Sequence, residues 1–94
     1  MTETRARGKI KVAGRVQGVG FRYFALQLAK QGAITGWIKN EPDGTVSLDA
    51  EGTKTDLDGF IDSLKTGAMS GYVRSLTVEW LPRSMNYTTF EIVR

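Results

Sequence analysis

The chain has 94 residues, which fits one domain, because stable domains run to roughly 100–150 residues. Apolar residues make up 40% and charged residues 24% of it, without any apolar run near the ~20 residues of a membrane span, which excludes a disordered or transmembrane chain. The formal net charge is only +3, and the absence of cysteine and histidine excludes disulfides, thiolate nucleophiles, histidine-based triads and the usual zinc sites.

The N-terminal segment, residues 1–8, is polar and lacks the apolar core of a signal peptide. We interpret it as a flexible tail in front of a single domain over residues 9–94 of a cytoplasmic protein. Residues 9–16 then alternate, with apolar side chains such as Ile10 and Val12 on one side and basic side chains on the other. This alternation predicts a strand.

The periodicity changes to that of a helix after a glycine-rich stretch. Apolar residues recur at the three- and four-residue spacing of an amphipathic helix, at Phe21, Phe24, Ala25, Leu28 and Ala29. Gly32 follows a basic last turn and predicts the end of this helix.

A hairpin is predicted next. Residues 34–39 read as a short strand, and residues 41–44, with the sequence EPDG, form a turn, since proline presets its φ and glycine tolerates a positive φ. Apolar side chains then alternate with polar ones at Val46, Leu48 and Ala50, which predicts the second strand of the hairpin.

The remaining elements are a second helix and two strands. Thr55 is the predicted cap of a helix that ends at Gly67, with its apolar face formed by Leu57, Phe60, Ile61 and Leu64. Alternation at residues 76–80 and 90–92 predicts the last strands. The order β-α-β-β-α-β predicts a ferredoxin-like α+β sandwich, with two helices on one face of a mostly antiparallel sheet.

The stretch between the first strand and the first helix is the first candidate site. Gly14, Gly18 and Gly20 allow successive backbone N–H groups to point into one concavity, and the helix N-terminus adds partial positive charge. Arg22, at the start of the helix, is suited to clamping phosphate oxygens. The spacing matches neither the dinucleotide fingerprint nor the P-loop. The alternative is a turn that only tightens the connection.

Asn40 is the second candidate, because it stands at the end of a strand, directly before the turn. A crossover connection brings this strand near the first one, so the Asn40 side chain is expected near the mouth of the glycine loop. A carboxamide carries both an acceptor and a donor, which suits holding a water molecule in one orientation. The alternative is that Asn40 only stabilises the hairpin turn.

Two segments resemble the signatures of a known family. Residues 14–22, with the sequence GRVQGVGFR, resemble the signature loop of the acylphosphatases. Residues 36–40, GWIKN, followed by DGTV at 43–46, resemble the second signature of that family. The resemblance covers nearly all of the chain after the polar tail. It fails at residues 67–73, GAMSGYV, where the family often has a proline-containing turn, a departure that concerns loop rigidity and stability.

The resemblance implies a ferredoxin-like fold and the hydrolysis of small acyl phosphates to a carboxylate and inorganic phosphate. By position, Arg22 matches the phosphate-binding arginine of the family, and Asn40 matches the asparagine that orients the attacking water. The phosphate cradle is matched by the backbone N–H groups of Gln17, Gly18, Val19, Gly20 and Phe21.

The same residues lead us to a hypothesis on mechanism. An acyl phosphate has a good leaving group, so the site needs only to neutralise the phosphoryl oxygens and to position a water. Neither motif contains a general base, so the bound phosphate itself is expected to take the proton of the water. The hypothesis is a reaction that uses no metal, cofactor or phosphoenzyme.

Two other functions compete with this one. One is a ferredoxin-like module that binds RNA or a small effector. Such modules usually have exposed aromatic residues on their central strands and a denser basic patch, and neither is evident in this sequence. An acylphosphatase-like domain of a larger carbamoyl-transferring maturation enzyme is disfavoured by the start at Met1 and the lack of zinc-finger cysteines. We expect a monomer without a nucleic-acid or membrane partner.

Overall fold

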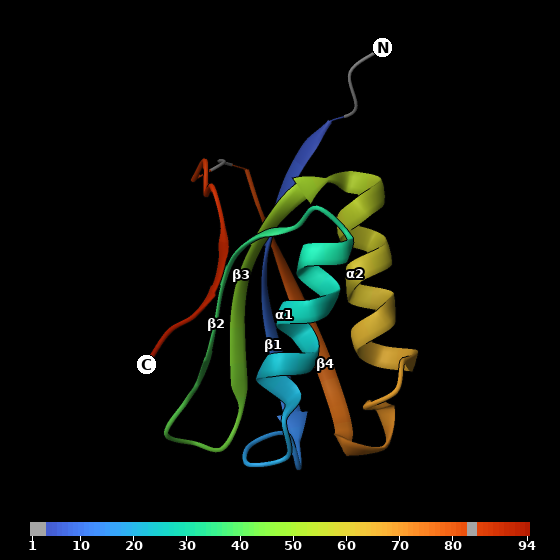
Figure 1. The fold of residues 1–94 in the computed structure, drawn as a ribbon, viewed down its shortest axis with the longest axis vertical. Helices are drawn as coiled ribbons and strands as arrows, with labels where there is room; N and C mark the ends of the chain where they lie inside the picture. Colours follow the sequence, from blue (N-terminus) through green and yellow to red (C-terminus); the bar gives the residue numbers. More distant parts are fainter. Residues whose placement is uncertain (1–3, 83–84) are drawn as a thin grey trace.

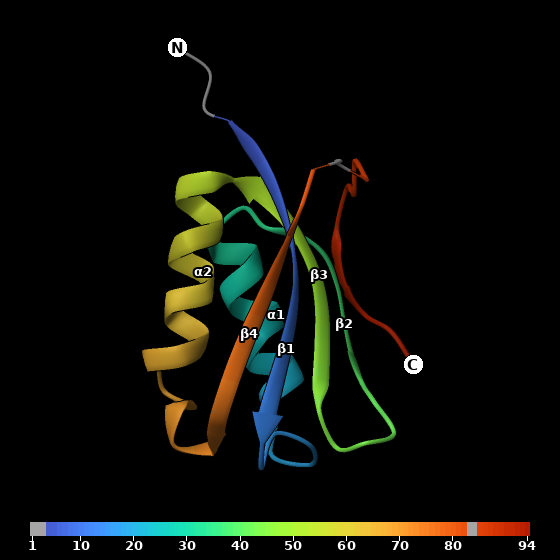
Figure 2. The ribbon, with the colours of Figure 1, turned by 180° about the vertical axis from the view of Figure 1, so that it is seen from behind.

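The computed structural model describes residues 4–82 and 85–94, which form one sheet with two α-helices on one of its faces (Figures 1 and 2). The strands are β1 (Arg5–Gly14), β2 (Thr35–Asn40), β3 (Val46–Thr53), β4 (Val73–Leu81) and β5 (Phe90–Ile92). The helices are α1 (Phe21–Gln31), α2 (Lys54–Thr66) and the short 3-10 helix η1 (Ser70–Tyr72). The strand order is β4-β1-β3-β2-β5, and among the pairs that these described strands form, β2 with β5 is parallel and the other three are antiparallel. The predicted ferredoxin-like fold is confirmed.

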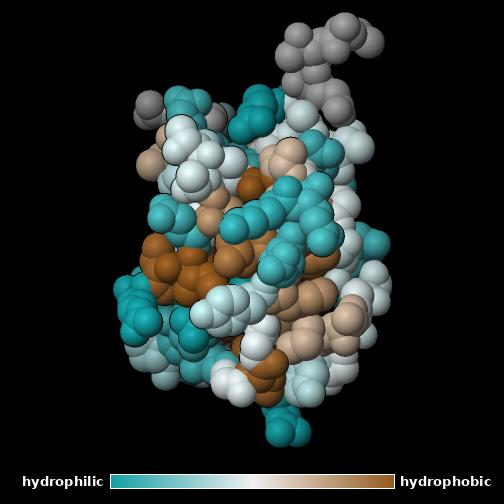
Figure 3. Space-filling model, in the orientation of Figure 1, coloured by the Kyte–Doolittle hydropathy of each residue, from teal (hydrophilic) through white to brown (hydrophobic). Residues whose placement is uncertain are grey.

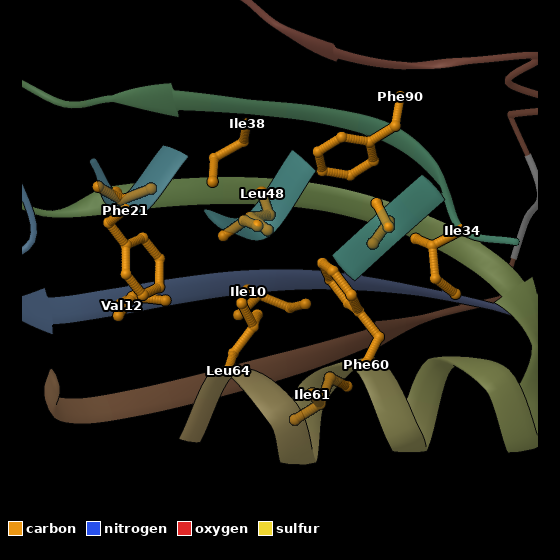
Figure 4. Close-up of a cluster of buried hydrophobic side chains, with 14 of the residues drawn as sticks. Ile10, Val12, Phe21, Ile34, Ile38, Leu48, Phe60, Ile61, Leu64 and Phe90 are labelled. Carbon is orange, nitrogen blue, oxygen red and sulfur yellow. The ribbon is translucent and has the colours of Figure 1, made fainter. Parts of the chain in front are cut away.

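The hydrophobic core fills the space between the helices and the sheet (Figure 4). Alternate residues of the central strands, such as Ile10 and Leu48, face the helices, as their period of two requires. Phe60 of α2 meets Phe90 of β5 edge to face, with ring centroids 6.0 Å apart. Each fully buried side chain of this size contributes about 1.5–3 kcal/mol by leaving water. On the outside of the helices, polar side chains surround smaller apolar areas (Figure 3).

Strand β1 begins earlier than the sequence indicated. Residues 5–8, which were expected in a flexible tail, belong to the strand, with Arg5 opposite Thr53 and Gly8 opposite Ala50 of β3. The prediction was wrong for these residues because their pairing partners lie far away in the sequence. The rest of the expected tail, residues 1–3, lies outside the described residues. The strand ends at Gly14, after an irregularity in its pairing with β4.

Helix α2 has a different cap from the predicted one. The hydroxyl of Thr53, and not that of Thr55, accepts the backbone N–H of Asp56 at 3.1 Å. Thr53 ends β3 in the extended conformation that a cap residue needs, with ψ 155°, whereas Thr55 already lies within the helix. Lys54, the first helical residue, pairs with Asp58 one turn later at 2.7 Å.

Two carboxylates are buried on the sheet face that the helices leave open. Asp49 and Glu51 are only 2% and 1% exposed. The guanidinium of Arg7 donates to both Asp49 oxygens, at 2.8 and 2.5 Å, and the Tyr87 hydroxyl donates at 3.1 Å. Glu51 accepts the backbone N–H groups of Met85 and Tyr87 at 2.7 and 2.8 Å. The carboxylates thus fasten the segment before β5 to the back of the sheet.

The environment of this cluster also changes how its groups titrate. The hydrogen bond with Asp49 raises the pKa of the Arg7 guanidinium, and burial raises the pKa of the Tyr87 hydroxyl. Trp37 donates from its indole N–H to the same hydroxyl at 3.2 Å. Arg7, at a position expected in the tail, is therefore part of the folded structure.

We expect Arg7→Met to destabilise the protein by on the order of 3 kcal/mol, because it takes the charged partner from a buried carboxylate. The free energy of unfolding, from urea titration, measures this loss. Adding Asp49→Leu should recover part of it, since the uncompensated charge is then gone as well. An Arg7→Met variant as stable as wild type would show that the ion pair contributes nothing to folding.

Candidate active site

The glycine-rich loop of residues 15–20 joins β1 to α1 at the end of the molecule that also carries the β2–β3 hairpin (Figures 1 and 2). Gly18 and Gly20 adopt the left-handed conformation, with φ of 76° and 88°. A Cβ atom at either position would meet no atom within 4 Å, so the backbone conformation and not crowding calls for glycine. Val19, between them, has no positive φ, so the sign of φ alternates along these three residues. An alternation of this kind turns neighbouring backbone N–H groups toward one concavity.

Both ends of this loop are fixed to the folded body. Val16 and Phe21 are each 1% exposed and belong to the core. At the first residue of the loop, the backbone N–H of Arg15 donates to the carbonyl of Tyr72 at 2.9 Å. Gly14 lies so close to Tyr72 that a Cβ atom there would stand 2.2 Å from the carbonyl oxygen. The loop therefore projects from a rigid base.

Helix α1 begins at this loop with an uncapped N-terminus. Its cap residue, Gly20, offers no side chain to the first N–H groups, and the first turn carries no acidic residue. The backbone N–H of Phe24 closes the first helical bond to the carbonyl of Gly20 at 3.0 Å. The earlier N–H groups and the helix dipole together favour an anion at this end.

A small hollow of about 100 Å³ opens at the same end of the helix. Its lining residues are Val16, Gly18, Gly20, Phe21, Arg22 and Tyr23. Among the residues that the structure describes, Arg22 has no carboxylate within ion-pair distance. The sequence-predicted arginine and three of the predicted loop residues thus share one concavity that carries positive charge.

Asn40 lies on the helix side of the sheet, at the end of β2. Ile38 points into the core, and Asn40, two residues later, points to the same side. Its Oδ1 atom is buried and accepts no hydrogen bond from residues 4–82 or 85–94. A buried acceptor is costly when it lacks a donor, so this atom is suited to a hydrogen bond from a bound molecule.

The turn of the hairpin is held by Asp43 and not by the Asn40 oxygen. Asp43 Oδ1 accepts the backbone N–H of Thr45 at 2.9 Å and its hydroxyl at 2.6 Å. The Thr45 hydroxyl and backbone N–H lower the pKa of Asp43 to about 2. Asp43 is therefore an ionised acceptor for both bonds at pH values well above that value.

The side chain of Gln17 links the loop to this hairpin. Its Nε2 atom donates to the backbone carbonyls of Glu41 and Thr45, at 2.8 and 2.9 Å. The two candidate motifs are thus in direct contact. Sequence reasoning used only the backbone N–H of Gln17 and missed this bridge, although a long amide side chain amid glycines was a signal.

A larger hollow, of about 440 Å³, lies on the open face of the sheet. Its charged and polar lining comprises Lys9, Lys11, Glu41, Asp43, Ser47 and Glu79. Lys11 pairs there with Asp43 at 3.4 Å. Charges of both signs face this hollow, and it includes neither the glycine loop nor the N-terminus of α1. Its size alone therefore does not make it the anion site.

Within residues 4–82 and 85–94, no three histidine, cysteine, aspartate or glutamate side chains are grouped so as to hold a metal ion. In the same part of the chain, no helix combines the length and the apolar character needed to cross a membrane.

The chain as a whole is similar to proteins of one family. The family model for acylphosphatase matches residues 8–92. An acylphosphatase from Oceanobacillus iheyensis is 40% identical over 85 residues, which cover 89% of this chain and 93% of that one. The crystal structure of acylphosphatase from Bacillus subtilis superposes with a TM-score of 0.89 at 37% identity, covering 95% of this chain and 99% of that chain. Full-length HypF, in a phosphate- and nucleotide-bound form, contains a similar unit, with a TM-score of 0.90 at 26% identity over 12% of its own length. The chain therefore belongs to the acylphosphatase family.

Proposed function

We propose that this protein hydrolyses small acyl phosphates to a carboxylate and inorganic phosphate, without a metal or another cofactor. The observation that carries the proposal is the hollow at the uncapped start of α1, where the left-handed glycines and Arg22 lie together. An oxyanion is the ligand that this combination of N–H groups, helix dipole and guanidinium favours.

In the proposed complex, the phosphoryl oxygens bind to the loop and to the arginine. The backbone N–H groups of residues 17–21 donate to the oxygens, and the guanidinium of Arg22 neutralises their charge. Fixed donors of this kind stabilise the charge that redistributes in the transition state and need not reorganise during the reaction. The acyl group makes none of these contacts, so the protein is expected to accept many small acyl phosphates.

Asn40 is proposed to orient the attacking water. Its buried Oδ1 atom accepts a hydrogen bond from the water, which directs the water oxygen toward phosphorus. The oxygen–phosphorus bond forms as the bond from phosphorus to the acyl oxygen breaks, and the carboxylate leaves with the electron pair. The proton of the water passes to a phosphoryl oxygen, which gives inorganic phosphate.

The leaving group explains why no acid or base is needed. Carboxylic acids have pKa values of about 4, so a carboxylate departs without being protonated at neutral pH. The side chains assigned to the reaction, those of Arg22 and Asn40, include no histidine, cysteine or carboxylate that could act as a general acid or base. We therefore expect kcat to be nearly constant between about pH 6 and pH 8.

The direct test is the hydrolysis of benzoyl phosphate in the presence of EDTA, followed from pH 6 to pH 8. We expect rapid release of benzoate and phosphate that EDTA does not slow, with a flat dependence of kcat on pH. A folded protein without this activity would contradict the proposed function. Loss of activity on chelation, or a bell-shaped profile with two enzyme pKa values near neutrality, would contradict the proposed mechanism.

We also propose that the protein acts as a cytoplasmic monomer that binds neither nucleic acid nor membranes. Among the described residues, the large apolar side chains exposed on the surface come from separate parts of the chain, at Tyr23, Tyr72, Trp80 and Met85. Sedimentation of the purified protein at micromolar concentration measures its mass, and a dimer would contradict the proposal.

A further inference from the structure

The side-chain amide of Gln17 donates hydrogen bonds to the two residues that flank the turn of the β2–β3 hairpin, Glu41 and Thr45. Glu41 directly follows Asn40 in the chain. Both carbonyls that it reaches also accept a backbone bond within the hairpin. The Glu41 carbonyl accepts the N–H of Gly44 at 3.1 Å, and the Thr45 carbonyl accepts the N–H of Glu41 at 2.8 Å. Gln17 therefore adds a second donor to the two carbonyls that define the turn.

The sheet by itself does not bring the loop and Asn40 together. Strand β3 lies between β1 and β2, so the end of β1 and the end of β2 are separated by two strand spacings, or about 10 Å. The glycine loop spans this separation. In the described part of the chain, the two Gln17 bonds are the side-chain hydrogen bonds that join loop 15–20 to the hairpin.

We propose that Gln17 is a positioning residue, whose side-chain amide fixes the distance between the phosphate cradle and the water held by Asn40. This inference rests on the proposed function, in which cradle and water come from different segments. In-line attack requires the bound phosphoryl group and the water to keep one fixed relative position. A misplacement of about 1 Å costs as much as 10²-fold in rate. The backbone N–H of Gln17 binds phosphate, whereas its side chain acts through Asn40.

The chemistry of the contact requires an amide. Both hydrogens on Nε2 are used, one for each carbonyl. Leucine has a similar size but no donor, and glutamate would turn an anionic oxygen toward two carbonyl oxygens. Either substitution keeps the backbone N–H that the cradle needs.

The test compares Gln17→Leu with Gln27→Leu, the same exchange at an exposed position of α1. We expect Gln17→Leu to lower kcat for benzoyl phosphate by about 10- to 100-fold. The inhibition constant of inorganic phosphate should stay within about twofold of wild type, because the N–H groups and Arg22 remain in place. The Gln27→Leu control should match wild type in both quantities.

Several outcomes would overturn the inference. An unchanged kcat would show that the bridge positions nothing, and a parallel rise of the phosphate inhibition constant would show that the side chain merely supports the cradle. If wild type does not hydrolyse benzoyl phosphate, the proposed function fails and this inference fails with it. An active wild type with a fully active Gln17→Leu variant refutes the inference alone.

A double-mutant cycle tests the route through Asn40. If Gln17 acts by placing Asn40, adding Gln17→Leu to Asn40→Ala should lower kcat no further, because the group that it positions is already gone. Independent, multiplicative losses in the double variant would contradict this route.

Discussion

Replacing Arg22 by alanine is expected to lower kcat/KM by about 10³-fold, with a higher KM and a lower kcat. The guanidinium is proposed to contact the phosphoryl group both in the bound substrate and in the transition state, so its removal affects binding and reaction alike. Steady-state kinetics with benzoyl phosphate and inhibition by inorganic phosphate separate the two effects. The inhibition constant should rise together with KM.

Arg74→Ala is the matched control for this variant. It removes the same side chain from an exposed position of β4 and changes the net charge equally. If the two variants lose activity to the same extent, the effect of Arg22 is one of overall charge and not of a contact with phosphate. Arg22→Lys should be intermediate, because lysine keeps the charge but not the planar pair of donors.

Asn40→Ala should lower kcat by about 10²- to 10³-fold and leave the inhibition constant of inorganic phosphate nearly unchanged. Its side chain is proposed to contact the attacking water and not the phosphoryl group, so phosphate binding does not depend on it. The cost to stability should be small, because Asp43 and Thr45 hold the turn. Measurement of kcat, of the inhibition constant and of the urea midpoint on one preparation tests all three expectations.

The two variants together distinguish the roles of the two motifs. Loss of phosphate affinity in Arg22→Ala but not in Asn40→Ala would agree with binding by the loop and water orientation by the strand end. If Asn40→Ala weakened phosphate binding as strongly as Arg22→Ala, Asn40 would be a phosphate ligand, and its proposed role would be wrong.

The parts of this protein that were predicted correctly depend on short-range patterns. Strand alternation at Ile10 and Val12 and the helical spacing from Phe21 onward each follow from neighbouring residues, and both recur in the structure. The order of these elements then restricts the fold to a few arrangements, of which the ferredoxin-like one is confirmed.

The features that were missed depend on residues far apart in the chain. The sequence around Arg7 is polar, and both its strand pairing with β3 and its hydrogen bonds to Asp49 involve residues at least 42 positions later in the chain. The bridge from Gln17 spans 24 and 28 positions. Thr53 and Thr55 are equally good caps by composition, and the end of β3, where Thr53 pairs with the distant Arg5, decides between them. Local patterns contain no information on such contacts.

The strand order has a consequence for how the protein folds. β1 and β2 follow each other in the chain but do not pair, and the β2–β3 hairpin is the pairing between strands joined by a short turn. Most strand pairs can therefore form only after a large loop has closed, so we expect this protein to fold more slowly than a helical bundle of the same length. The loop and hairpin meet only when β1 has inserted beside β3. We therefore expect the return of activity during refolding to lag behind helix formation and to coincide with completion of the sheet.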